Sequence, residues 1–261
     1  MNSLQTENLT MLVFDVFGTV VDWRSSVIAE CEQLGKAKNL NIDWVAFAEA
    51  WRSIYRPYMD KVQNGELPWT KLDDLHRMML AETLKKFAID SLSDDEKEHL
   101  NRVWHRLTPW PDSVAGLQRI KSHFVISPLS NGNISLLTNM AKHAGLPWDC
   151  ILSAENVRAY KPDPAVYLLA PQLFDLKPEQ VMMVAAHEHD LQSARKHGLR
   201  TAFVHRPLEH GPGKAAAIPP ADRYDIVAND FLGLADQLSE YRLCRNCHSE
   251  PKAKNLDFVR G

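Results

Sequence analysis

Met11-Leu12-Val13-Phe14-Asp15-Val16-Phe17 is an apolar run that holds a single acid, and Gly18-Thr19 follows it. A short apolar run that ends in a polar turn is typical of a buried strand. The run from Phe124 to Leu129, which ends at Ser130-Asn131-Gly132, has the same form. Further short runs lie at Cys150 to Leu152, Val181 to Ala186 and Thr201 to Val204, with a weaker one at Ile226 to Ala228.

Segments with helical patterning separate these runs from about residue 112 onward. They span Ser113 to Ser122, Ile134 to Ala144 and Leu191 to His197, and a glycine follows each of the last two. Pro171 is expected to kink or end the helix that contains Tyr167. Alternating strands and helices predict an α/β fold with a mostly parallel sheet covered on both faces.

The stretch from Arg24 to Leu107 interrupts this alternation. Its apolar and aromatic residues recur every three to four positions, which indicates helices. We therefore expect a discontinuous core (1–23 and 108–243), an inserted helical cap (24–107) and a polar C-terminal tail (244–261) that lacks periodicity.

Composition excludes several classes of protein. The 261 residues include 30 Lys+Arg and 33 Asp+Glu, so the formal charge of −3 gives no basic surface for nucleic acid or an anionic membrane. No apolar stretch approaches the ~20 residues that span a bilayer. Met1 to Thr10 does not resemble a signal peptide, so we expect a cytoplasmic protein whose four cysteines are thiols.

Polar side chains follow four of the predicted strands: Asp15, Ser130-Asn131, Lys161 and Asp190. The carboxyl ends of parallel strands line the ligand crevice of such sheets, so we expect these groups to converge. A lysine near Asp15 would keep a nucleophilic carboxylate ionised and aimed. The structural alternatives are a loop-capping carboxylate at Asp15, a solvated Lys161, a helix N-cap at Asp190, and a simple turn at Ser130-Asn131.

These motifs, taken in order, resemble the haloacid dehalogenase superfamily over about residues 11 to 232. The resemblance is carried by Phe14-Asp15-Val16-Phe17-Gly18-Thr19, Leu129-Ser130-Asn131-Gly132, Tyr160-Lys161-Pro162-Asp163 and the segment from Val184 to Asp190. It implies a Rossmann-like core with a cap that closes over a nucleophilic Asp15.

Phosphatases of this superfamily carry a second acid two residues after the nucleophile, where this chain has Phe17. That acid protonates a leaving alcohol, whereas a halide leaves as a stable anion and needs no proton. The sequence is most similar to the type II L-2-haloacid dehalogenases. The resemblance thus implies hydrolysis of a small 2-haloacid to a 2-hydroxy acid through an ester on Asp15, without cofactor or metal, in what can be a homodimer.

The resemblance also assigns roles to individual residues. Arg52, in Trp51-Arg52, would receive the halide, and Asp190 with Lys161 would help to activate water. The remaining assignments place the following residues beside the nucleophile or the substrate: Val16, Phe17, Thr19, Ser130, Asn131 and Tyr167. Without the resemblance, Arg52 would be a surface charge on an amphipathic helix and Tyr167 a packing residue.

Ala185 and His187 depart from the family pattern, which has Ser and Asn there. An imidazole with an ordinary pKa of about 6.5 could act as a base, or bind halide when protonated. The alternative is a histidine bonded to nearby loop backbone. The bulk of the His187 ring would narrow the pocket and favour small substrates such as haloacetates, including fluorinated ones.

Two weaker patterns and two rival functions stay open. Cys244, Cys247 and His248 spell a haem-attachment motif or half a zinc site, but neither an export signal nor a second ligand pair accompanies them. Gly211-Pro212-Gly213-Lys214-Ala215 is better explained as a turn than as a phosphate-binding loop. The rival functions are a phosphatase with an eroded Mg²⁺ site and a non-catalytic small-molecule binding protein.

Overall fold

The computed structural model describes residues 9–248, and side chains up to residue 240. Its main sheet has six parallel strands in the order β5-β4-β1-β6-β7-β8. The strands are β1 (Met11–Phe14), β4 (Val125–Ser130), β5 (Leu152–Ser153), β6 (Val181–Ala185), β7 (Arg200–Val204) and β8 (Ile226–Ala228). The helices that connect or follow these strands are α6 (Ser113–Lys121), α7 (Ile134–Ala144), α8 (Pro164–Leu173), α9 (Glu188–Lys196) and α10 (Phe231–His248).

Strand β1 lies at the centre of the sheet, with β4 on one side and β6 on the other. The chain extends the sheet from β1 through β4 to β5, then returns to the opposite side of β1 to add β6, β7 and β8. Such a reversal of strand order opens a crevice at the carboxyl ends of the strands beside it. Asp15 follows β1 directly, so the topology places this acid in the crevice.

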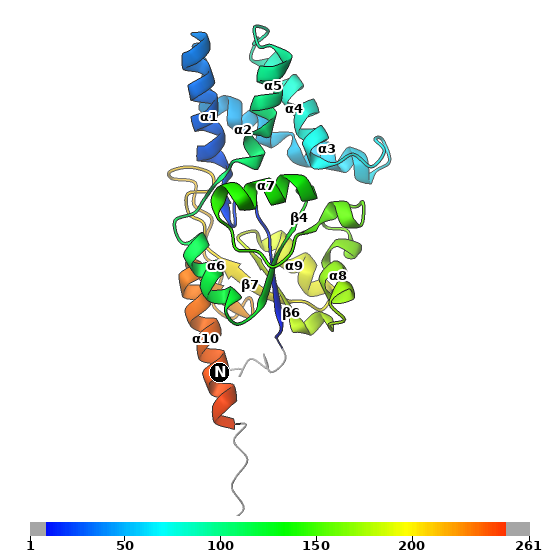
Figure 1. Ribbon diagram of the computed structural model, residues 1–261, viewed down its shortest axis with the longest axis vertical. Coiled ribbons are helices and arrows are strands. Elements are labelled where there is room, and N and C mark those ends of the chain that lie inside the picture. The colour runs from blue at the N-terminus through cyan, green and yellow to red at the C-terminus, as the bar shows by residue number, and fades with distance from the viewer. Residues whose placement is uncertain (1–8, 249–261) are drawn as a thin grey trace, which may run out of the picture.

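The helices of the cap lie between two short strands, β2 (Val21–Asp22) and β3 (Thr108–Pro109), which pair antiparallel. They are α1 (Trp23–Lys38), α2 (Trp44–Ser53), α3 (Tyr55–Gln63), α4 (Leu72–Lys86) and α5 (Asp94–Asn101). Figure 1 shows these helices, in blue to green-cyan, as a separate layer above the sheet and its flanking helices. The observed architecture confirms the predicted α/β fold with an inserted helical cap; the exact domain boundaries stay a prediction.

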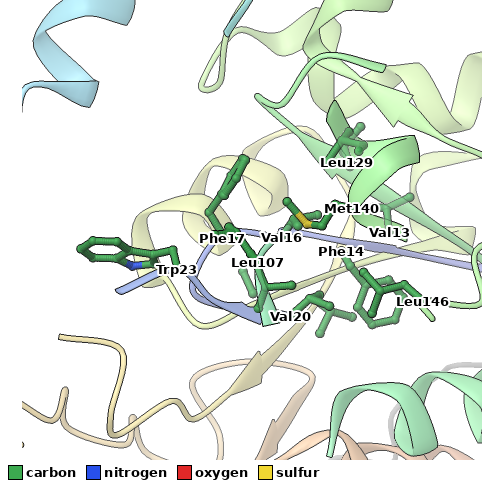
Figure 2. Packing of buried hydrophobic residues seen from close by; sticks show 14 of the residues in the cluster. Val13, Phe14, Val16, Phe17, Val20, Trp23, Leu107, Leu129, Met140 and Leu146 are labelled. Carbon is green, nitrogen blue, oxygen red and sulfur yellow. The ribbon is translucent and has the colours of Figure 1, made fainter. Parts of the chain in front are cut away.

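Aromatic side chains form the part of the core that joins the cap to the sheet. Phe17, which comes from the loop after β1, packs edge-on against Trp104, and Trp104 packs against Trp51 of α2. All three are almost completely buried. Figure 2 shows Val13 and Phe14 toward one side of this cluster and Phe17 and Trp23 toward the other.

Several local expectations need adjustment. The first strand ends at Phe14 rather than Phe17, because the chain turns there into the loop that carries Asp15. Pro171 lies inside α8, which ends two residues later at Leu173. A polar tail was expected from residue 244, but α10 continues to His248, so Cys244 to His248 are helical. The side chains of these residues lie outside the described part of the structure. Within residues 9–248, no helix is long and apolar enough to cross a membrane.

Candidate active site

The two carboxylate oxygens of Asp15 have different surroundings. Oδ2 accepts hydrogen bonds from Thr19 Oγ1 (2.8 Å) and faces His187 Nδ1 at 3.1 Å. The ammonium of Lys161 lies 3.7 Å from Oδ1, and no other group in the described part of the chain pairs with that oxygen. One oxygen is therefore held by donors, while the other is free to react.

The loop after β1 fixes Asp15 through its backbone. Asp15 N donates to Val184 O (3.0 Å) on the neighbouring strand β6. Thr19 Oγ1 accepts from Ala186 N (3.0 Å), so its own proton is directed at Asp15. Gly18 has a φ of 87°, a left-handed conformation that glycine adopts without strain. The predicted contact of Thr19 with the nucleophile is thus present.

Lys161 and Asp190 form a buried ion pair. Lys161 Nζ donates to Asp190 Oδ2 (2.6 Å), and the hydroxyl of Tyr167 donates to Asp190 Oδ1 (2.7 Å). The predicted contact of Asp190 with Lys161 is confirmed. The predicted N-cap role of Asp190 is wrong. Helix α9 begins at Glu188, so His187 takes the N-cap position and Asp190 lies in the first turn of the helix.

Charge keeps Asp15 ionised in spite of its burial. Burial raises the pKa of a carboxyl group, but the nearby Lys161 ammonium and the hydrogen bonds from His187 and Thr19 hold the pKa of Asp15 well below its ordinary value. An ionised carboxylate with one open oxygen is the form that a nucleophile requires.

His187 lies between two carboxylates. Its Nδ1 faces Asp15 Oδ2, and its Nε2 lies 2.9 and 3.0 Å from the two oxygens of Glu209. Burial by itself lowers the pKa of His187, but the hydrogen bonds and charges of Asp15 and Glu209 outweigh it and raise the pKa to about 10. The ring is therefore an imidazolium at neutral pH with both nitrogens protonated.

This state bears on two of the three predictions for His187, the general base and the histidine bonded to loop backbone. Its ring is bonded to two side chains, so the alternative of a histidine bonded to loop backbone is wrong. An imidazolium has no lone pair to take a proton, so the geometry does not favour a general base there.

Sequence reasoning missed Glu209, which lies in the loop after β7 and is only 5% exposed. The segment from His205 to Gly211 has no periodicity or known motif, although its single acid follows a strand end, as Asp15 does. Arg206 anchors this loop: Nε donates to Thr19 O (2.8 Å), and the two Nη atoms bind Asp112 at 2.7 and 2.9 Å.

Arg52 approaches the site from the cap. Its guanidinium lies 4.1 Å from the ring centre of Tyr55, 5.4 Å from that of Trp23 and 5.8 Å from that of Phe17. Aromatic faces attract such a cation and hold its plane. Nη1 is buried and has no hydrogen-bond partner among the described residues. The alternative of a solvated surface charge is therefore wrong.

The other predicted substrate residues divide into two groups. Asn131, Phe17 and Tyr167 line the cavity, and Asn131 Oδ1 also accepts from Lys161 N (2.9 Å). Val16 and Ser130 do not line it. Val16 is 1% exposed in the core, and Ser130 Oγ accepts from Gly132 N (3.1 Å), as a turn residue does.

The cavity lies between the cap and the carboxyl ends of the strands. Its volume is about 940 Å³, and both layers contribute to its wall. The charged residues of the wall are Asp15, Arg24, Glu49, Arg52, Arg56, Lys161, Asp190, Glu209 and Lys214, together with His187. Within residues 9–240, no three His, Cys, Asp or Glu side chains form a cluster that could hold a metal ion.

Known proteins match both the sequence and the fold. (S)-2-haloacid dehalogenase 4A of Burkholderia cepacia is 29% identical over 211 residues, covering 77% of this chain and 84% of that protein. Haloacetate dehalogenase H-2 of Moraxella sp. (strain B) is 23% identical over 77% of this chain and 87% of its own length.

Solved structures are more similar still. A defluorinating L-2-haloacid dehalogenase superposes with a TM-score of 0.86 at 46% identity, covering 88% of this chain and 95% of its own. A second L-2-haloacid dehalogenase gives 0.85 at 44% identity, covering 89% and 99%. Residues 9–198 match the model of the haloacid dehalogenase-like hydrolases, and the chain therefore belongs to that family.

Proposed function

We propose that this protein hydrolyses the carbon–halogen bond of a small 2-haloalkanoic acid and releases the 2-hydroxy acid. The observation that carries the proposal is that Asp15 and Arg52 line the same cavity, one from the core and one from the cap. Asp15 offers an ionised carboxylate with an open Oδ1, and Arg52 offers a half-buried cation whose Nη1 is buried and unpartnered. The similarity to haloacid dehalogenases, at 46% and 44% identity for two of them, supports the assignment.

In the first step, Asp15 Oδ1 attacks the halogen-bearing carbon, forms a carbon–oxygen bond, and expels the halide with its bonding electrons toward Arg52. Lys161 keeps Oδ1 ionised and aimed, since its ammonium lies 3.7 Å away. The cation and the aromatic rings around Arg52 provide a weakly hydrated site for a departing anion. Holding the carboxylate against carbon supplies much of the rate through orientation.

In the second step, water attacks Cγ of the Asp15 ester. Each oxygen of Asp190 holds one donor, and a carboxylate has about four lone-pair sites, so it retains capacity to accept a proton from water. Cleavage of the Cγ–Oδ1 bond then releases the 2-hydroxy acid, and Lys161 stabilises the oxygen that leaves. Asp15 returns as a carboxylate that carries the oxygen of water.

The site does not favour the phosphatase alternative. Phe17 occupies the position of the second acid, and its ring packs against Trp104 and faces Arg52. A leaving alcohol would find no proton donor there.

The substrate range that we propose is haloacetate and 2-halopropionate, including fluoroacetate. His187 occupies space beside Asp15 that a smaller side chain would leave open. One of the similar enzymes is named as a defluorinating L-2-haloacid dehalogenase, and another as a haloacetate dehalogenase.

Halide release from a panel of chloro- and fluoroacetate and both enantiomers of 2-chloropropionate tests the proposal. We expect release by the native protein with and without chelator, and none by Asp15→Asn. A single turnover in H₂¹⁸O should leave the first product unlabelled and place the label on Asp15. Release of phosphate from an ester, only with Mg²⁺, would instead identify a phosphatase, and binding without turnover a binding protein.

We also propose that the protein acts in the cytoplasm and forms a homodimer. Cys31 and Cys150 are free thiols, which fits a reducing compartment. Cell fractionation and sedimentation equilibrium test these two points.

A further inference from the structure

Glu209 is a buried acid that none of the steps above uses. It is 5% exposed, and its two oxygens lie 2.9 and 3.0 Å from His187 Nε2. A buried carboxylate is costly unless it is paired, so this contact is what permits Glu209 to remain ionised there. Burial would raise the pKa of Glu209, but the hydrogen bond and charge of His187 hold it below its ordinary value.

The nucleophile loop leaves room for this carboxylate. A Cβ at Gly18 would lie only 2.1 Å from Glu209 Oε1, so any other residue at position 18 would displace the acid. Arg206 fixes the other end, because it ties the Glu209 loop to the backbone of Thr19. Two segments far apart in sequence are thus fitted to each other around the Glu209 side chain.

His187 transmits this contact to the reacting group. Its Nδ1–H and the Thr19 hydroxyl both point at Asp15 Oδ2, at 3.1 and 2.8 Å. If Oδ1 attacks the substrate, Oδ2 becomes the carbonyl oxygen of the ester. Negative charge develops on this oxygen when water attacks Cγ. Two donors that point at it therefore form the geometry of an oxyanion hole.

We propose that Glu209 is a positioning residue that holds His187 doubly protonated, so that His187 and Thr19 stabilise the oxyanion on Asp15 Oδ2 during ester hydrolysis. This inference rests on the proposed function, because it needs the Asp15 ester.

Ester hydrolysis consumes one water molecule and releases one proton. The water oxygen bonds to Cγ, the carbonyl electron pair moves to Oδ2, and one water proton passes to Asp190. The carbonyl then re-forms as the Cγ–Oδ1 bond breaks, and the departing oxygen takes up the proton held by Asp190. The second water proton, left on the new carboxyl group of Asp15, is released to solvent, so Asp15 returns as a carboxylate. His187 donates a hydrogen bond throughout and transfers no proton.

Ester formation removes the charge of Asp15, which makes Glu209 the main group that keeps His187 protonated. The cationic or neutral groups nearby are His189, whose ring centre lies 5.6 Å from that of His187, His210, 3.8 Å from Glu209, and the more distant Arg52 and Lys161. The remaining acids of α9 are bonded elsewhere, Glu188 to Tyr224 and Asp190 to Lys161, so Glu209 is the acid that contacts the imidazolium in the ester. With Asp15 ionised, the pKa of His187 is about 10, so in the ester it should be lower.

A double-mutant cycle with chloroacetate in single-turnover experiments tests the proposal. The variants are Glu209→Gln, which keeps the shape without the charge, His187→Asn, which keeps a neutral donor, and the combination. Chloride release reports ester formation, and glycolate release with intact-protein mass reports ester hydrolysis. The matched control is Glu188→Gln, which removes an adjacent acid that bonds Tyr224 instead.

For Glu209→Gln we expect chloride release within about threefold of the native rate and ester hydrolysis slower by about 10²-fold, with the covalent enzyme accumulating. The alkaline limb of the hydrolysis rate should move to lower pH by about one unit or more. Because Glu209 acts through His187, the double variant should be about as slow as His187→Asn alone. The Glu188→Gln control should match the native protein within about twofold.

Each contrary result has a separate meaning. If the native protein releases no chloride, the proposed function fails before this inference is reached. If chloride release occurs but Glu209→Gln leaves ester hydrolysis or its pH limb unchanged, the positioning role is wrong. Additive effects in the cycle would also overturn it. Should Glu209→Gln not fold, as judged by its thermal transition, ¹⁵N shifts of His187 in the native protein at pH 8 decide: two protonated nitrogens are required.

Discussion

The charged groups around Asp15 on the core wall of the cavity and Arg52 on the cap wall are satisfied in opposite ways. On the core side, charges are paired within 4 Å: Lys161 with Asp190, and His187 with both Asp15 and Glu209. On the cap side, Arg52 is surrounded by aromatic rings and keeps an unpartnered Nη1. A network of paired charges holds a nucleophile in one position, whereas a half-buried cation with an unpartnered nitrogen retains its affinity for an anion that arrives during the reaction.

Removing the charge of the nucleophile should have the largest effect. Asp15→Asn is expected to lower halide release by at least about 10⁴-fold, because the amide cannot attack carbon and the ester cannot form. Ion chromatography of halide from chloroacetate measures this. Retained release above about 1% of the native rate would show that another residue starts the reaction.

The cap wall is tested next by Arg52→Lys. This change keeps the positive charge but removes the planar guanidinium that lies over Tyr55, together with the unpartnered Nη1. We therefore expect ester formation to slow by about 10- to 10²-fold. Arg77→Lys, an exposed cap arginine, is the matched control. If ester hydrolysis slows and ester formation does not, Arg52 acts in the same step as the core-side charges, and the contrast between the two walls is wrong.

A third change tests how the core wall is held in place. Arg206→Lys loses the two-point contact with Asp112 and is expected to lower the free energy of unfolding by about 2 kcal/mol. Urea denaturation measures it. Arg119→Lys, whose pair with Asp236 is exposed, should cost less than about 0.5 kcal/mol. Equal costs for the two would mean that Arg206 does not anchor the loop.

The pH dependence of stability tests the charge of His187. The pKa of His187 is about 10 in the folded protein against an ordinary value of 6.5, so its stabilisation is complete below pH 6.5 and is lost as the pH rises through about 10. The stability advantage of the native protein over His187→Asn should therefore narrow across that range. Unfolding free energies of both proteins at pH 6, 8 and 10 measure the difference, and an advantage that widens with pH would contradict the charged state.

Sequence reasoning recovered the parts of the site that follow regular strands. Asp15 was predicted because it is the single acid of an apolar run, and Lys161 because it follows the third predicted strand; their contact follows from the parallel sheet. The short apolar runs predicted the strands of the main sheet to within a few residues. Ser130 was assigned to substrate by resemblance alone, and its hydroxyl bonds to the turn instead of lining the cavity.

The remainder of the site depends on contacts that no local pattern encodes. Glu209 meets His187 because an irregular loop folds back over Gly18, and only the three-dimensional structure shows that approach. The N-cap alternative for Asp190 is also wrong, because the helix begins at Glu188 and the preceding His187 takes the capping position.

The short ribbon of β2 and β3 has a consequence for how such proteins diversify. Val21 pairs with Pro109, so the chain leaves the sheet layer and returns to it at adjacent points. A different helical block could be joined at those points without changing the length or register of any strand in the main sheet. The chemistry of Asp15 would then be inherited unchanged, while the residues that meet the substrate from above would be replaced as one unit.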